Sequence, residues 1–187
     1  NGMFDLRQGH TTRVDESQPV PSTLVSEAAR TLIAFSGVTI LPDIPEYYRK
    51  YPALLNFLSA QKMPWKESRT LAGEIGEYIV MMRETEDAYL VGAATNESGR
   101  TIDLPLSFLE KGKYTVEVIE DGDDAHYLTN RESLKVTTWQ LTNNDKLALK
   151  LAPGGGACLV IKKTPSMRVG EQAAFPLVSP SWKIGRE

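Results

Sequence analysis

The residues of this chain that could do chemistry are a loop of carboxylates, two histidines and a single cysteine. The loop Glu120-Asp121-Gly122-Asp123-Asp124 places four carboxylates within five residues, and calcium prefers hard oxygen ligands of this kind. The loop lacks the regular spacing and the terminal bidentate glutamate of an EF-hand, so its composition favours a turn. We therefore expect no metal site in this chain.

The histidines and the cysteine predict no nucleophilic site. His10 and His126 have no neighbouring cysteine or serine motif, and each is expected to lie in a loop or on the surface. Cys158 is the only cysteine, which excludes an internal disulfide, and its place before Leu159-Val160-Ile161 predicts a buried thiol. Gly154-Gly155-Gly156 lacks the lysine and hydroxyl residue of a phosphate loop and predicts a tight turn instead.

Three aromatic residues leave two interpretations open. Trp65, Tyr89 and Trp139 would stack on sugar rings if they were exposed in a line. Aromatic residues in strands more often fill a core or an interface between domains. The sequence alone does not separate a sugar-binding surface from a packed core.

A two-residue period dominates the second half of the chain. Leu147, Leu149 and Leu151 alternate with polar or small residues, as expected of strands with one face in a core and the other in water. We expect eight strands, at 67–72, 76–84, 88–94, 100–106, 113–119, 134–141, 146–151 and 156–163. Short connections with turn residues join them, which favours antiparallel neighbours. The predicted fold is mainly β, an antiparallel β-sandwich.

The first 62 residues follow a different period. Apolar residues recur at helical spacing from Leu24 to Ile33, with Ser22 as the expected N-cap. Val38–Leu41 is an apolar run typical of a strand buried on both faces. A second helix is expected to begin at Pro52, with one apolar face made by Leu54, Leu55 and Leu58.

This helix-strand-helix segment is too small for an independent core, because one strand and two helices leave the strand edges unpaired. It therefore resembles the end of a larger α/β domain. The change of period predicts a domain boundary near residues 61–66. We divide the chain into an incomplete domain at 1–62, the sandwich at 63–163 and a tail at 164–187.

Composition and charge exclude two classes of protein. Formal net charge is −3 and the lysines form no basic face, which argues against nucleic-acid binding. No apolar run approaches the roughly 20 residues that span a bilayer. The chain begins Asn1-Gly2-Met3 without a visible export signal.

Several motifs together resemble the C-terminal end of glycoside hydrolase family 97, a family of α-glucosidases and α-galactosidases. They are Pro42-Asp43-Ile44-Pro45-Glu46-Tyr47-Tyr48, Trp65-Lys66-Glu67-Ser68-Arg69, Gly76-Glu77-Tyr78-Ile79-Val80, Tyr89-Leu90-Val91-Gly92-Ala93, Leu106-Ser107-Phe108-Leu109, 114–122 and 151–156. Their order and spacing cover about residues 20–163. The resemblance implies that residues 1–62 are the last part of a catalytic (β/α)8 barrel, with 38–41 as its closing strand.

The resemblance assigns no catalytic residue to this chain, because the family's catalytic and calcium-binding carboxylates belong to motifs that have no match here. It implies no cofactor in this chain and calcium in the full-length enzyme. Asp43 follows the expected closing strand, where active-site groups project from barrels, although it could equally cap the next helix. Asp5 lies beside Gly2-Met3, near which the family has an aspartate. Asp43 and Asp5 are the expected substrate-proximal residues.

The resemblance implies a C-terminal fragment of an α-glycosidase. The sandwich would support the barrel and would be able to associate with further copies, and this chain alone would not be catalytic. The expected partners are the rest of the glycosidase chain, the oligosaccharide substrate of the full enzyme and a homo-oligomer, in the periplasm or outside the cell. The alternatives are a carbohydrate-binding module, and an independent enzyme using Asp5, Asp43 and the 120–124 loop.

Overall fold

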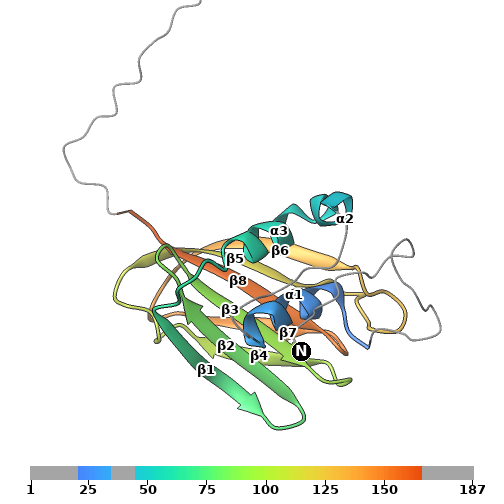
Figure 1. Cartoon of the computed structure of the whole chain (residues 1–187). Coiled ribbons are helices and arrows are strands. Elements are labelled where there is room, and N and C mark those ends of the chain that lie inside the picture. The colour runs from blue at the N-terminus through green and yellow to red at the C-terminus, as the bar shows by residue number, and fades with distance from the viewer. Residues whose placement is uncertain (1–20, 35–44, 166–187) are drawn as a thin grey trace, which may run out of the picture.

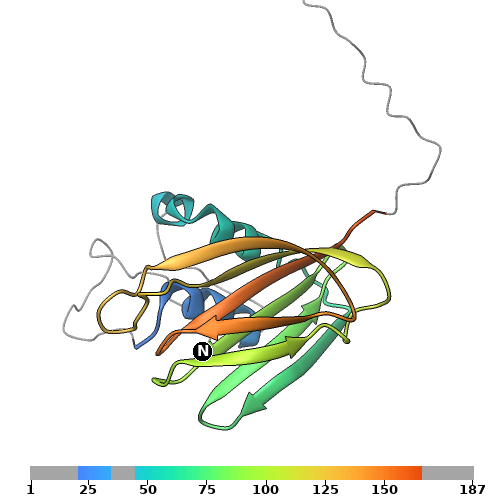
Figure 2. The same ribbon diagram turned by 180° about the vertical axis from the view of Figure 1, so that it is seen from behind.

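The computed structural model describes residues 21–34 and 45–165, and these are mainly antiparallel β-structure. The larger sheet has six strands in the order β1-β2-β3-β8-β5-β6, and the smaller sheet pairs β4 with β7. The strands are β1 Glu67–Glu74, β2 Tyr78–Glu84, β3 Tyr89–Thr95, β4 Arg100–Pro105, β5 Lys113–Asp121, β6 Leu134–Thr142, β7 Lys146–Leu151 and β8 Gly156–Lys163. The two sheets face each other, with β4 and β7 nearest the viewer in Figure 2. This arrangement confirms the predicted antiparallel sandwich and all eight of its strands.

Three strand boundaries differ from the prediction by two residues and four others by one, and two of the larger differences have local reasons. β2 begins at Tyr78 instead of residue 76, because Gly76 has a φ of 81° and forms the turn before the strand. β1 continues to Glu74, past residue 72, because a bulge between Thr70 and Ala72 restores its pairing with β2.

The sandwich core lies between the two sheets and follows the alternation read from the sequence. Tyr114, Val116 and Val118 of β5 are buried in it, as are Leu149 and Leu151 of β7. The lysines that alternate with the leucines of β7 remain on its outer face. The period of two therefore places one side of each of these strands in the core.

The opposite face of the six-stranded sheet is covered by helices. α1 spans Leu24–Ile33, α2 spans Pro45–Lys50 and α3 spans Pro52–Ser59, and α1 and α3 lie across the sheet in Figure 1. They form a second hydrophobic cluster with the outer side chains of β3, β5 and β8, which are Leu90, Ile119, Cys158 and Val160. We call α1, α2 and α3 the helix layer. It explains why β3 and β8 are buried on both faces.

α1 approaches the backbone of the sheet directly at two glycines. A Cβ at Gly92 would lie 2.9 Å from the carbonyl oxygen of Ala29, and one at Gly156 would lie 2.6 Å from Cα of Ser26. Both distances are shorter than van der Waals contact. Any larger residue at these positions must push α1 away from the sheet.

Both ends of α1 are fixed to the sandwich. The N-cap is Thr23, whose hydroxyl accepts from the amide of Ser26 at 3.2 Å, so the expected N-cap Ser22 was wrong by one residue. Ser22 instead donates to the carboxylate of Glu27. At the other end, Arg83 of β2 donates to the carbonyls of Leu32 and Ile33, each at 3.3 Å. A cation there suits the negative end of the helix.

α3 begins at Pro52 as predicted, but it buries a different face. Leu54 and Phe57 are buried against the sheet, whereas Leu55 is 37% exposed. Of the expected face, Leu54 is buried and Leu58 is half-buried against the sheet, but Leu55 was wrong, because Phe57 shares the inward side with Leu54 at helical spacing. The strand expected at 38–41 lies outside the described residues. None of the described helices is long and apolar enough to span a membrane.

We predict that Gly156→Ala lowers the free energy of unfolding by about 1–3 kcal/mol, because the new methyl group overpacks the contact between α1 and β8. Urea denaturation measures the change. Gly73→Ala in β1 is the control, because its Cβ would meet Tyr78 O at 3.2 Å and no helix, and its cost should stay below about 1 kcal/mol. Equal costs for the two variants would contradict the close packing of α1.

Candidate functional site

The two expected substrate-proximal residues, Asp5 and Asp43, lie outside the described residues, as does His10. Their proximity to a substrate stays a prediction. The independent enzyme that would combine them with the 120–124 loop requires all these carboxylates to converge, and the loop itself can be described.

The carboxylates of the 120–124 loop are used to hold the loop together. Asp121 is buried, and its Oδ2 accepts from the amides of Ala152 at 3.0 Å and Gly156 at 2.8 Å. Asp123 pairs with Lys150 at 2.7 Å, and Asp124 accepts from the Ser133 hydroxyl at 2.5 Å. Burial raises the pKa of Asp121 despite these hydrogen bonds. Within 21–34 and 45–165, no group of three or more possible metal ligands comes together.

His126 and Cys158 have structural roles. Nδ1 of His126 accepts from the amide of Leu128 at 3.1 Å, and its ring stacks on Tyr127 in a loop. Cys158 is fully buried beneath α1, as predicted, and burial raises the pKa of its thiol well above the ordinary value. A neutral buried thiol is a poor nucleophile.

The three aromatic residues that could have bound sugar do not form one surface. Trp65 packs against the helix layer, and the guanidinium carbon of Arg83 lies over it, 4.5 Å from the centroid of the Trp65 ring. Tyr89 packs on the sandwich core, against Tyr114 at 6.3 Å between ring centroids. Trp139 lies apart from both on β6 and is 50% exposed. The carbohydrate-binding alternative required all three in an exposed line, so it loses its support.

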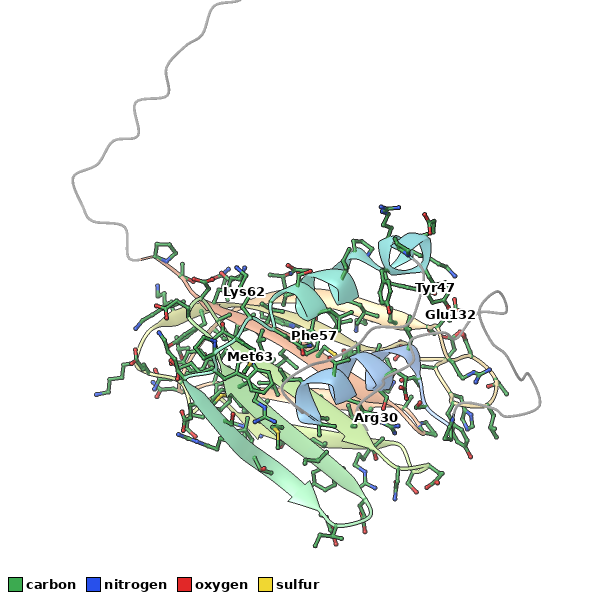
Figure 3. All side chains as sticks on the ribbon, in the orientation of Figure 1. Arg30, Tyr47, Phe57, Lys62, Met63 and Glu132 are labelled. Carbon is green, nitrogen blue, oxygen red and sulfur yellow. The ribbon has the colours of Figure 1, made fainter. Side chains whose placement is uncertain are left out.

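A cluster of polar side chains joins α2 to the loop before β6, and Figure 3 labels two of its members. Glu132 accepts from the Tyr47 hydroxyl at 2.5 Å, from Lys50 Nζ at 2.7 Å and from the Tyr51 hydroxyl. Lys50 also lies over both tyrosine rings, 5.6 and 5.1 Å from their centroids. We call Tyr47, Lys50, Tyr51 and Glu132 the Glu132 cluster.

The electrostatics of the Glu132 cluster favour its charged form. Partial burial opposes ionisation of Glu132, but hydrogen bonds from Lys50, Tyr47 and Tyr51 hold its pKa at about 2. Burial first, and then the same carboxylate, raise the pKa of Tyr47, while the hydrogen bond to Glu132 raises that of Lys50. The cluster therefore keeps Glu132 as an anion and Lys50 as a cation at neutral pH.

An open groove lies between the C-terminal half of α1 and the β1–β2 hairpin. Its volume is about 590 Å³, and its lining includes Arg30, Ile33, Tyr78 and Ile79. Ile75, at the tip of the hairpin, also lines it and is fully exposed. Apolar exposure of this kind marks a contact surface. Neither the groove nor the Glu132 cluster was predicted, because each joins residues that are distant in the sequence.

The fold and these contacts define a β-sandwich that carries a helix layer, with the carboxylates of the 120–124 loop engaged in structural contacts. The model of the family "Glycosyl-hydrolase 97 C-terminal, oligomerisation" matches residues 64–162. The chain belongs to this family.

The relatives are longer enzymes. A retaining alpha-galactosidase of Bacteroides thetaiotaomicron is 33% identical over 170 residues, covering 87% of this chain and 25% of that protein. A probable retaining alpha-galactosidase of Streptomyces bingchenggensis is 28% identical over 123 residues, covering 66% of this chain and 19% of that protein. This chain thus spans about a quarter or less of the curated relatives it matches.

A solved structure shares the arrangement of the elements. It is a glycoside hydrolase family 97 enzyme from Pseudoalteromonas sp. strain K8 in complex with acarbose, with a TM-score of 0.73 and 29% identity. The alignment covers 78% of this chain and 23% of that enzyme. Both this alignment and that of the Bacteroides relative cover more of the chain than the segment 64–187 contains. The similarity therefore reaches into the helix layer.

We predict that Glu132→Gln lowers the free energy of unfolding at pH 7 by about 1–2 kcal/mol, after discounting for solvent screening of a partly exposed group. The folded-state pKa of Glu132 is about 2 and its ordinary value is 4.5. Its stabilisation is therefore complete above the ordinary value and is lost as the pH falls through the folded value. Urea denaturation at several pH values should show the difference from wild type shrinking over that interval.

Glu46→Gln is the matched control for this measurement. Glu46 lies on α2, the helix that the Glu132 cluster contacts, but its pair with Arg49 at 3.5 Å is exposed on both sides. Its substitution should leave stability unchanged at every pH. If the two variants behaved alike, the Glu132 cluster would not hold α2 to the sandwich.

Proposed function

We propose that this chain is the C-terminal part of an α-glycosidase, in which it supports the catalytic barrel and mediates self-association. The bond cleavage is assigned to parts of the enzyme outside this chain, where two carboxylates would act on an α-glycosidic bond. The match of residues 64–162 to a C-terminal oligomerisation domain supports self-association. The length of the curated relatives supports a larger enzyme.

The observation that carries the supporting role is the burial of one face of the sandwich by α1 and α3. These helices precede the part of the chain that matches the family model, and they share a hydrophobic cluster with β3, β5 and β8. A sandwich joined in this way to the segment before it moves with that segment as one body. The helix layer would thereby hold the sandwich at a fixed position relative to the barrel.

The substrate class of the whole enzyme is proposed from what its relatives are described to do. Both curated relatives are described as retaining alpha-galactosidases, one of them as probable, so α-galactosides are the first substrates to test with the whole enzyme. We further propose that the enzyme acts in the periplasm or outside the cell, uses calcium held by other parts of its chain, and brings Asp5 and Asp43 near the substrate. This chain itself is assigned no cofactor.

We predict that the purified 187-residue chain self-associates in solution. Multi-angle light scattering over a range of concentrations should give a mass of at least twice the 20.7 kDa of one chain. Far-ultraviolet circular dichroism on the same sample confirms that the sandwich is folded. A folded chain that stays monomeric at the highest concentrations would contradict the proposed role in self-association.

A further inference from the structure

The free edges of the two sheets differ in how they are protected against pairing with another chain. An edge strand presents a row of unpaired backbone groups, and proteins block such edges with charges, proline or bulges. β1 has a bulge between Thr70 and Ala72 and carries Glu67, Arg69 and Glu74. In the smaller sheet, β4 carries Asp103 and Pro105, and β7 carries two lysines.

β6 lacks these protections. Its nine residues pair with β5 in unbroken register, from Leu134 opposite Asp121 to Thr142 opposite Lys113. Lys135 is its only charged residue, and it contains no proline. No described segment pairs with its outer edge, since β6 ends the order of the six-stranded sheet. Among the described edges, β6 is therefore the one suited to continue a sheet.

Both faces of β6 carry exposed apolar side chains. Val136, opposite Ile119, lies on the helix side and is 43% exposed. Trp139, opposite Val116, lies on the sandwich side and is 50% exposed. A strand added at this edge would cover part of each. Contacts on both faces are what a continued sheet requires.

We propose that β6 pairs antiparallel with β6 of a second copy of this chain, which joins two six-stranded sheets about a two-fold axis near Thr138. This inference rests on the proposed self-association and names its surface. Antiparallel pairing about Thr138, the middle residue of β6, meets the requirement that a two-fold interface be self-complementary. It places Thr137 opposite Trp139 of the second copy, a favourable pairing of a β-branched with an aromatic residue.

The charge on β6 agrees with this register. Lys135 would lie opposite Leu141 of the second copy and about 20 Å from its own counterpart, at roughly 3.4 Å per residue along the strands. The two lysines therefore do not oppose each other. A second copy is favoured over a different protein, because β6 has a single charged residue and so lacks the charges that would give electrostatic complementarity to another partner.

Cysteine cross-linking tests the position of the axis. Thr138 is exposed and the native Cys158 is fully buried, so Thr138→Cys adds a single accessible thiol to the full 187-residue chain. The two new thiols would lie within disulfide range in the proposed pairing. Mild oxidation should then give a covalent dimer on non-reducing gels, roughly tenfold faster than for the distant controls Lys135→Cys and Thr70→Cys.

Thr138→Lys tests the same contact by repulsion. It sets two ammonium groups face to face at the axis of the dimer. In the monomer the new lysine can form an ion pair with Glu117, which lies directly opposite on β5 of the same chain. Light scattering should show the mass halved relative to wild type, with the far-ultraviolet circular dichroism spectrum of a folded chain. Thr70→Lys on β1 should keep the wild-type mass.

Three results would overturn the inference. If wild type self-associates, but Thr138→Lys keeps its mass and Thr138→Cys cross-links no faster than the controls, the interface lies elsewhere and self-association itself stands. A monomeric wild type removes the proposed self-association together with this interface. If removal of residues 166–187 is needed before maleimide labels Thr138→Cys, the chain's own C-terminal segment occupies β6 in place of a second copy.

Discussion

The close contact between α1 and the six-stranded sheet is the constraint on which the rest of this structure depends. The helix lies over Gly92 and Gly156, where the space left for a side chain is less than one methyl group. The small residues Ser26 and Ala29 face these glycines from the helix side. This packing closes the outer face of β3 and β8, so that the central strands are buried on both sides. Without the helix layer, of which α1 is the part nearest the strand backbones, Leu90, Cys158 and Val160 would face water.

Polar contacts then fix the position of the helices along the sheet. The amide of Leu24 donates to the carbonyl of Arg131 at 2.8 Å, and Arg83 reaches the last carbonyls of α1. The Glu132 cluster holds α2 to the same loop that contacts the start of α1. Hydrophobic contact determines that the helices cover the sheet, whereas these directional bonds determine where they lie. A module with its layers fixed in this way suits a role as a rigid support.

The strands could be predicted from the sequence, and the contacts between elements could not. The two-residue alternation in 146–151 and the apolar run in 156–163 each contain enough periodicity to place a strand. The helical period of 24–33 reveals an apolar face but not its partner, and the partner proved to be the sheet. By residue type Ser22 is the better N-cap of the adjacent pair Ser22 and Thr23, so only the backbone reveals that Thr23 is the cap. Tyr47 and Glu132 are 85 residues apart, and no local pattern relates them. The roles predicted for Asp5 and Asp43, outside the described residues, stay predictions.

The central claim is that the helix layer and the sandwich form one cooperative unit. Native-state hydrogen exchange of the backbone amides tests this claim most directly, when it is measured for each residue over a series of urea concentrations below the unfolding transition. If the account is right, the slowest amides of α1 exchange with the same opening free energy as those of β8, because the helix cannot leave without exposing the sheet. Exchange of α1 through a separate opening of much lower free energy, with β8 still protected, would contradict the account.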